Sequence, residues 1–168
     1  MMIIGGSGAG WIYGGGTWSA SGQTWMQAGK VNTPPASTAW AEANLGGFTG
    51  LSKYVYVMWH VNGPYRGHAV HFEIYDASGI KVNTVVDETK HADGLALSND
   101  TFSGWYLLGN KKIPITSTTV LRMFKDSTAT SSEYVQSDAI LLSDFPVIGN
   151  CSVGSVNNFE FMTGLSAP

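Results

Sequence analysis

Hydrophobic and polar residues alternate one by one over residues 69–75. Val70, Phe72 and Ile74 fall on one side, and the residues between them, beginning with His71, fall on the other. A period of two is typical of a β-strand that buries one face against a core and leaves the other open. The segment therefore predicts a half-buried strand.

Two neighbouring segments extend this pattern into a sheet. Residues 54–59 are all apolar or aromatic and of types that suit a pleated surface, which predicts a strand covered on both faces. Residues 80–86 alternate again, and the turn at 76–79 makes them the expected antiparallel partner of the strand before them.

Turn residues divide the rest of the chain into short segments that we also interpret as strands. These are residues 2–4, 38–45, 104–108, 112–115, 118–124 and 134–143. Ala, Glu and Leu in 38–45 would also suit a short helix, but the length and the glycines that follow favour a strand. About nine to eleven strands, with no convincing amphipathic helix, predict an all-β fold, a β-sandwich of the jelly-roll type.

Length and composition fit one domain of this kind. The chain has 168 residues, of which 12% are charged, about half the usual fraction of roughly 25%. Residues 1–146 are expected to form the sandwich. Residues 147–168, which carry no charge except Glu160, are expected to form a tail or an added edge strand. The single Cys151 excludes an internal disulfide framework.

Net charge and the length of the apolar runs restrict the classes of partner and the location that we expect for this protein. A formal net charge of −3 gives no basic face for nucleic acid, and no stretch approaches the ~20 apolar residues of a membrane span. We see no signal peptide at the start of the chain. Low charge with many glycines and aromatic residues is typical of an extracellular, cell-surface or virion-surface protein.

The densest cluster of polar and aromatic residues lies in and around the loop at 60–68. Six residues are predicted to bind a ligand there: Trp59, His60, Tyr65, Arg66, His68 and His71. Aromatic faces stack on sugar rings, and charged planar groups bond sugar hydroxyls, so this set favours a glycan. Alanine at Tyr65 and Arg66 is expected to abolish glycan retention.

A second aromatic group lies near the start of the chain, where Trp11, Trp18 and Trp25 fall within fifteen positions. They are either a platform for sugars or part of the packing under the sandwich. Packing is favoured because tryptophan is highly buried on average.

Other chemistries fit the sequence poorly. The glycine pattern at Gly6 fails as a dinucleotide motif, because Trp11 stands where a small residue is needed. The polar loop at 87–103 has no EF-hand or zinc spacing, so no cofactor is expected, and a structural calcium ion is left open. Glu73 and His71 share a strand face, but such a pair is more often a polar stripe than an acid–base couple. We therefore expect a protein that is not an enzyme.

Seven short motifs occur in a recognisable order. They are Gly16-Thr17-Trp18, Ala39-Trp40-Ala41, the strand at 55–58, the Ala-led strand at 69–74, Val86-Asp87, the Trp-x-x-Leu-Gly motif at 105–109 and the Tyr-Val-x-x-Asp-Ala-Ile strand at 134–140. In these motifs the chain resembles golvesin-like domains, also described as the carbohydrate-binding-like domain of xanthan lyases. The resemblance covers about residues 2–143.

The resemblance implies a jelly-roll sandwich without catalytic residues of its own and with carbohydrate binding as its role. The chain departs from the family at Gly5-Gly6-Ser7, which replace an acidic turn, in the longer loop at 87–103, and in the tail that stands where the family has a catalytic partner. Two functions follow as hypotheses. One is a binding module for a polysaccharide or glycan; the other is a structural subunit of a larger assembly, such as a phage or virus capsid, decoration or fibre protein, that forms homo-oligomers or meets its neighbours through 147–168.

Overall fold

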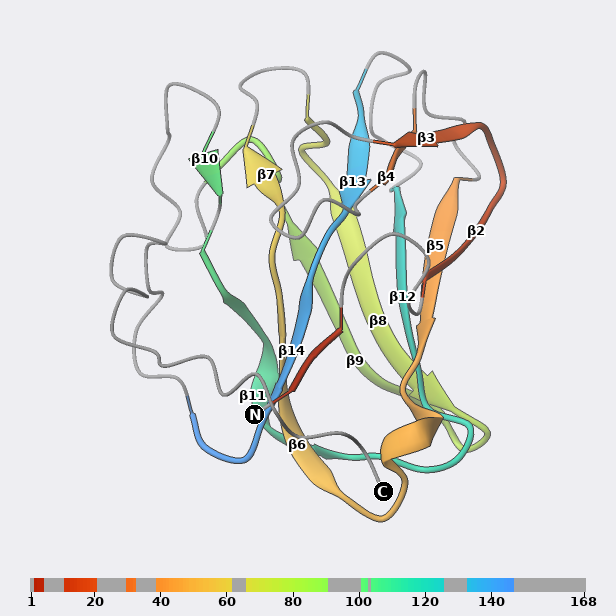
Figure 1. Ribbon diagram of the computed structural model, residues 1–168, viewed down its shortest axis with the longest axis vertical. Helices are drawn as coiled ribbons and strands as arrows, with labels where there is room; N and C mark the ends of the chain where they lie inside the picture. The colour runs from red at the N-terminus through yellow and green to blue at the C-terminus, as the bar shows by residue number, and fades with distance from the viewer. Residues whose placement is uncertain are drawn as a thin grey trace.

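Two antiparallel sheets face each other as a β-sandwich in the computed structural model of this chain (Figure 1). The structure describes residues 2–4, 11–20, 30–32, 39–61, 66–90, 101–102, 104–125 and 133–146. The prediction of an all-β sandwich is confirmed. The tail predicted at 147–168 lies outside the described residues.

The two main sheets form opposite sides of the sandwich in Figure 1. One has four strands in the order β1 (Met2–Ile4), β14 (Ile140–Ser143), β6 (Ser52–Val57) and β11 (Tyr106–Pro114). The other has five strands in the order β2 (Trp11–Gly14), β5 (Trp40–Asn44), β12 (Val120–Lys125), β8 (Val70–Asp76) and β9 (Gly79–Val86). A single 3-10 turn, η1 (Gly46–Phe48), follows β5 among the described residues.

Two small sheets lie at the upper end of the sandwich in Figure 1. They pair β13 (Val135–Ser137) with β4 (Lys30–Asn32) and β3 (Trp18–Ala20), and β10 (Thr101–Phe102) with β7 (His60–Val61). The described residues thus form fourteen strands, more than the nine to eleven expected. The prediction at 2–4 matches β1, but the strands β4, β7 and β10, of two or three residues, are too short for alternation to reveal them.

Alternate residues of both sheets build the core, as their period of two predicts. Val70, Phe72 and Ile74 of β8 are buried and pack in one cluster with Val55 and Val57 of β6. Burying each such side chain contributes about 1.5–3 kcal/mol. The β8–β9 hairpin has the predicted antiparallel pairing, and residues 40–44 form a strand rather than a helix.

The four-stranded sheet is covered on its outer face as well. Tyr56 alternates with the core residues of β6 and is buried in a second cluster, which also contains Met58, Trp105 and Leu141. The prediction that residues 54–59 are covered on both faces is therefore confirmed for 55–59, whereas Tyr54 is only partly buried. The strand itself ends at Val57, two residues earlier than expected.

Two strand predictions were wrong in extent. Residues 104–108 and 112–115 were expected to be separate strands, but they belong to one strand, β11, whose pairing with β6 shifts register between Leu108 and Ile113. Residues 134–143 were expected to be one strand, but the chain leaves the ladder at Asp138 and Ala139, so β13 and β14 lie in different sheets.

The tryptophans near the start of the chain take part in packing. Trp11 is buried in the core, and its Nε1 donates a 2.9 Å hydrogen bond to the Asp138 carbonyl. Trp18 is partly buried against the core, and its ring centroid lies 5.0 Å from that of Tyr13. Packing was the favoured interpretation for both residues. Trp25 lies outside the described residues.

Candidate functional site

The six residues predicted to bind a ligand do not form one surface. Trp59, His60 and Arg66 are buried. The indole Nε1 of Trp59 donates to the Lys90 carbonyl at 3.0 Å, and Arg66 Nε donates to the His60 carbonyl at 3.0 Å. The Trp59 and Arg66 side chains and the His60 carbonyl therefore stabilise the base of the loop from inside the sandwich. Whether they bind a ligand stays a prediction.

A buried carboxyl group shares this interior with Arg66. Glu88 is fully buried, its Oε2 accepts a 3.2 Å hydrogen bond from the Gln136 amide, and its own amide donates to the Gly67 carbonyl at 2.9 Å. Burial raises the pKa of Glu88 to about 8, although the Arg66 charge opposes this shift. The sequence pattern placed Glu88 in a polar loop, and nothing in that pattern predicted its burial.

The remaining loop residues lie nearer to solvent. His68 has a side chain 58% exposed, and its Nδ1 lies 3.0 Å from Oε1 of Glu133. Glu133 also accepts a 3.1 Å hydrogen bond from the His68 amide. Tyr65 lies outside the described residues, so its place relative to His68 stays a prediction.

His71 lies elsewhere, on the outer face of the five-stranded sheet. Its ring stacks on Phe124 of the neighbouring strand β12, with the ring centroids 4.7 Å apart and the planes 10° from parallel. Its Nδ1 lies 3.1 Å from the Asn83 Oδ1 of β9. Three strands therefore fix the position of this imidazole.

The register of the sheet extends this stack into an aromatic row. Phe124 lies opposite His71 on one side and opposite Trp40 of β5 on the other. A Cβ at Gly14, the residue opposite Trp40 on β2, would overlap the Trp40 indole, so only glycine leaves room for the ring there. All three ring residues are partly exposed. We call Trp40, Phe124 and His71 the aromatic row.

A row of charged residues runs beside the aromatic row. Arg122 of β12 lies opposite Glu42 on one side and opposite Glu73 on the other. Its guanidinium carbon is 5.4 Å from the Trp40 ring centroid and 5.8 Å from that of Phe124, and its Nε is 3.4 Å from Glu42 Oε1. The cation thus lies against the aromatic row, where cation–π attraction stabilises it.

Tyr75 completes the polar side of this face. Its hydroxyl donates a 2.9 Å hydrogen bond to Glu42 Oε1. Burial, and then this hydrogen bond, raise the pKa of Tyr75, so its hydroxyl keeps its proton. We call the aromatic row, the charged row and Tyr75 together the open face.

The open face can hold a ligand but shows no metal site. Aromatic rings offer flat apolar surfaces, and the carboxylates, guanidinium and amide offer hydrogen-bonding groups beside them. Among the described residues, no group of three His, Cys, Asp or Glu side chains gathers where it could hold a metal ion. In the same part of the chain, no helix has the length and apolar character to cross a membrane.

Sequence reasoning identified one residue of the aromatic row, His71, and missed the other two. Alternation placed His71 and Glu73 on one strand face, as observed. Trp40 and Phe124 stood in predicted strands, but nothing in the sequence placed these strands beside the one that carries His71.

Comparisons with known proteins add a fold relationship. Neither protein-family models nor curated protein sequences match this chain. Among solved structures, a Paenibacillus xanthan lyase determined to 2.6 Å resolution is similar, with a TM-score of 0.64 and 19% sequence identity. The match covers 86% of this chain but only 13% of that chain. This chain thus shares its fold with a small part of a xanthan lyase.

Proposed function

We propose that this chain is a non-catalytic carbohydrate-binding module and that the open face is its binding surface. The observation that carries the proposal is the aromatic row of Trp40, Phe124 and His71, set beside charged and hydroxyl groups on an exposed sheet. The fold shared with part of a protein named for its action on xanthan supports a carbohydrate-related role.

The geometry of the row suits a sugar chain. Neighbouring strands lie about 4.8 Å apart, so a row across three strands spans about 10 Å, room for two linked pyranose rings. The C–H-rich faces of such rings pack on aromatic faces, and their hydroxyl groups need donors and acceptors at the side. Arg122 and Glu42 supply these groups in fixed positions.

The charged residues of this face support binding rather than catalysis. Glu42 Oε1 already accepts from the Tyr75 hydroxyl and pairs with Arg122. Glu73 lies opposite Arg122 in the sheet. These contacts suit fixed acceptors for sugar hydroxyls. We therefore expect binding without turnover.

Affinity electrophoresis in gels that contain a panel of polysaccharides tests the proposal. We expect Trp40→Ala to weaken binding about tenfold, because it removes the largest ring of the row. The matched control is Phe145→Ala, since Phe145 is an exposed aromatic residue outside the five-stranded sheet. Wild-type affinity in the Trp40 variant would reject this face as the site.

Two further variants sharpen the test. Gly14→Ala keeps Trp40 but displaces its indole, and Gly47→Ala is its control because a Cβ there meets nothing within 4 Å. We expect only the first to weaken binding. Tyr65→Ala tests the loop at 60–68 separately: loss of binding there, with Trp40→Ala unaffected, would move the site from the open face to the loop.

A structural subunit of a larger assembly is the second candidate. Three large aliphatic residues are exposed on strands that flank the aromatic row: Ile12 at 62%, Ile80 at 63% and Val85 at 52%. Ile12 of β2 lies opposite Glu42, and Val85 of β9 lies opposite His71, so these apolar groups border the open face at both edges of the sheet. Exposed apolar groups around such a surface favour a protein–protein contact. The oligomeric state in solution separates the two candidates.

A further inference from the structure

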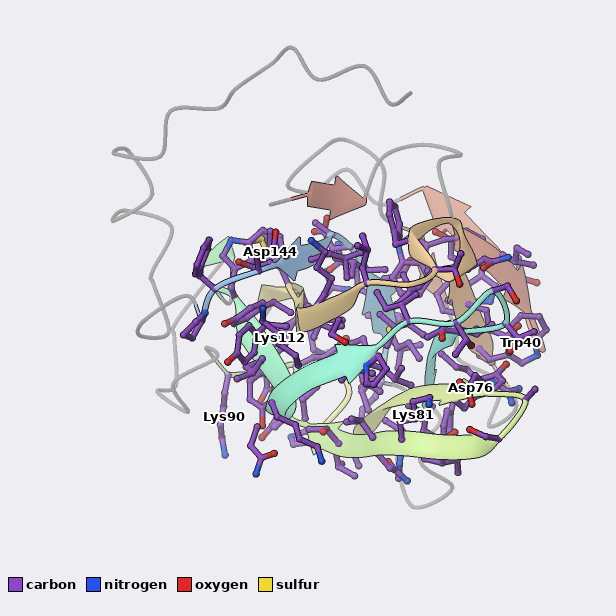
Figure 2. The ribbon with its side chains drawn as sticks, turned by 90° about the horizontal axis from the view of Figure 1, so that it is seen from below. Trp40, Asp76, Lys81, Lys90, Lys112 and Asp144 are labelled. Carbon is purple, nitrogen blue, oxygen red and sulfur yellow. The ribbon has the colours of Figure 1, made fainter. Side chains whose placement is uncertain are left out.

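A groove of about 450 Å³ lies where the two main sheets meet along one side of the sandwich. Its walls are residues 81–84 of β9 and residues 109–114 of β11. These are the end strands of the five-stranded and four-stranded sheets, and Figure 2 shows them side by side, with Lys81 and Lys112 labelled along them. We call this space the edge groove.

A bulge in β11 shapes the edge groove. Between Leu108 and Ile113 the strand β11 advances five residues while β6 advances only from Val55 to Lys53. Gly109 begins the bulge with a φ of +74°, and a Cβ there would lie 3.2 Å from Val82 Cγ2. The bulge therefore packs against β9, and its exposed residues line the groove.

Among the described residues, lysine side chains line the edge groove and no carboxylate does. The lysines are Lys81, Lys111 and Lys112. Lys81 Nζ already pairs with Asp76 at 3.0 Å, whereas Lys112 Nζ lies 5.8 Å from the Tyr54 ring centroid and Lys111 is exposed. The exposed Lys111 is thus available to an anion, and Lys112, whose Nζ lies over the Tyr54 ring, adds positive charge beside it. The amide and hydroxyl groups of Asn83, Asn110 and Thr84 also line the groove.

Asn83 connects the edge groove with the open face. It lines the groove, and its Oδ1 lies 3.1 Å from His71 Nδ1 of the aromatic row. A sugar chain stacked across β12 and β8 would therefore reach the groove directly on passing the edge strand β9.

We propose that the edge groove binds the carboxylate groups of an acidic polysaccharide whose neutral ring faces lie on the open face. This inference rests on the proposed function and adds the chemical class of the ligand. The Lys111 ammonium group can bind a carboxylate through charge-assisted hydrogen bonds, and its flexible side chain tolerates different positions of the anion. The neighbouring positive charge of Lys112 adds attraction. The bulge supplies selectivity for acidic chains.

Affinity electrophoresis of the full chain tests this with xanthan, alginate and polygalacturonate, each compared with its carboxyl-reduced derivative. We expect tighter binding to at least one acidic chain than to its reduced form. Lys111→Ala/Lys112→Ala should lower affinity for that acidic chain about five- to tenfold at low salt and leave the reduced form unaffected. At 0.5 M NaCl the difference should shrink, because salt screens exposed charges.

The controls separate this inference from the proposed function. Lys53→Ala/Lys90→Ala makes the same change of net charge outside the groove, and we expect it to bind like the wild type. Equal binding of acidic and reduced chains, or no effect of the groove variant, overturns the inference, while a loss in Trp40→Ala still supports a carbohydrate module. Wild-type protein that binds none of the six polysaccharides overturns both.

Discussion

Among the described residues, Glu88 is the one whose protonation has the largest expected effect on stability. It lies fully inside the sandwich with Oε2 bonded to the Gln136 amide, and its Oε1 has no hydrogen-bond partner among the described residues. An ionised carboxylate in such a place is costly, which is why burial raises its pKa to about 8. The folded state therefore holds a proton that the unfolded chain releases near pH 4.5.

The sign of the pH effect follows from this difference. Above pH 4.5 the unfolded state binds fewer protons than the folded state, so the free energy of unfolding falls as pH rises until Glu88 ionises near pH 8. We expect the wild type to lose about 1–3 kcal/mol relative to Glu88→Gln between pH 5 and pH 8. Urea unfolding of both proteins at the two pH values measures this.

Asp87 is the control for this experiment. Although burial opposes the shift, hydrogen bonds from Thr89 lower the pKa of Asp87. Its own contribution is therefore constant above about pH 5. Its charge also raises the pKa of Glu88, but far less than burial does, so Asp87→Asn should change the pH dependence much less than Glu88→Gln. A Glu88→Gln variant whose pH profile parallels that of the wild type would mean that Glu88 is ionised in the folded protein.

At the scale of single residues, a physical reason decides which site residues could be predicted from the sequence. Trp59, His60 and Arg66 were chosen because polar and aromatic residues are dense around them, but density does not reveal which side chains turn inward. His71 was identifiable because a period of two places it on the exposed side of its strand. The partners Trp40 and Phe124 depend on a register between segments far apart in the chain.

At the scale of elements, the carboxylate of Asp76 stabilises the turn of the β8–β9 hairpin. Asp76 accepts hydrogen bonds from the amide and hydroxyl of Ser78, which close the turn, and from the Thr116 hydroxyl of the connection between β11 and β12. It also pairs with Lys81 Nζ. The hydrogen bonds from Ser78, followed by the contact with Lys81, lower the pKa of Asp76 well below its usual range.

We expect Asp76→Asn to lower the urea midpoint at pH 7, because the amide loses the ion pair and accepts hydrogen bonds more weakly. A lowered pKa stabilises the fold above the unfolded value of 3.8, and this stabilisation is lost as pH falls below it. The variant should therefore lose less stability than the wild type in acid. Asp144→Asn, which removes a more exposed pair with Lys53, is the control and should change the midpoint less.

Elements were predictable where alternation runs unbroken over a whole strand. The hairpin of β8 and β9 meets this condition, and both its strands and its inward face were predicted. The bulge at 109–112 has the glycine and polar residues of a turn although the strand continues through it, whereas the break at Asp138 and Ala139 contains no glycine or proline. One strand was therefore divided and two were joined. Only pairing with other strands reveals such changes.

At the scale of the whole molecule, the two outer faces of the sandwich differ. The four-stranded sheet is covered by a second cluster that includes Tyr56 and Trp105, whereas the five-stranded sheet presents the aromatic row and exposed aliphatic residues. One open sheet face has room for either a glycan or a second copy of the chain. Both candidate functions, glycan binding and subunit assembly, would therefore use the same surface.

The mass of the full chain in solution distinguishes glycan binding from subunit assembly at this face. We expect light scattering after size exclusion to give the mass of one chain at every concentration, both for the wild type and for Val85→Asp. This substitution places a charge opposite His71, at the edge of the open face. A larger, concentration-dependent mass that Val85→Asp abolishes would instead make this face a subunit interface, because a buried unpaired carboxylate is costly. A larger mass that survives the substitution would place the interface elsewhere, and deletion of residues 147–168 would then test the tail while glycan binding at the open face stays intact.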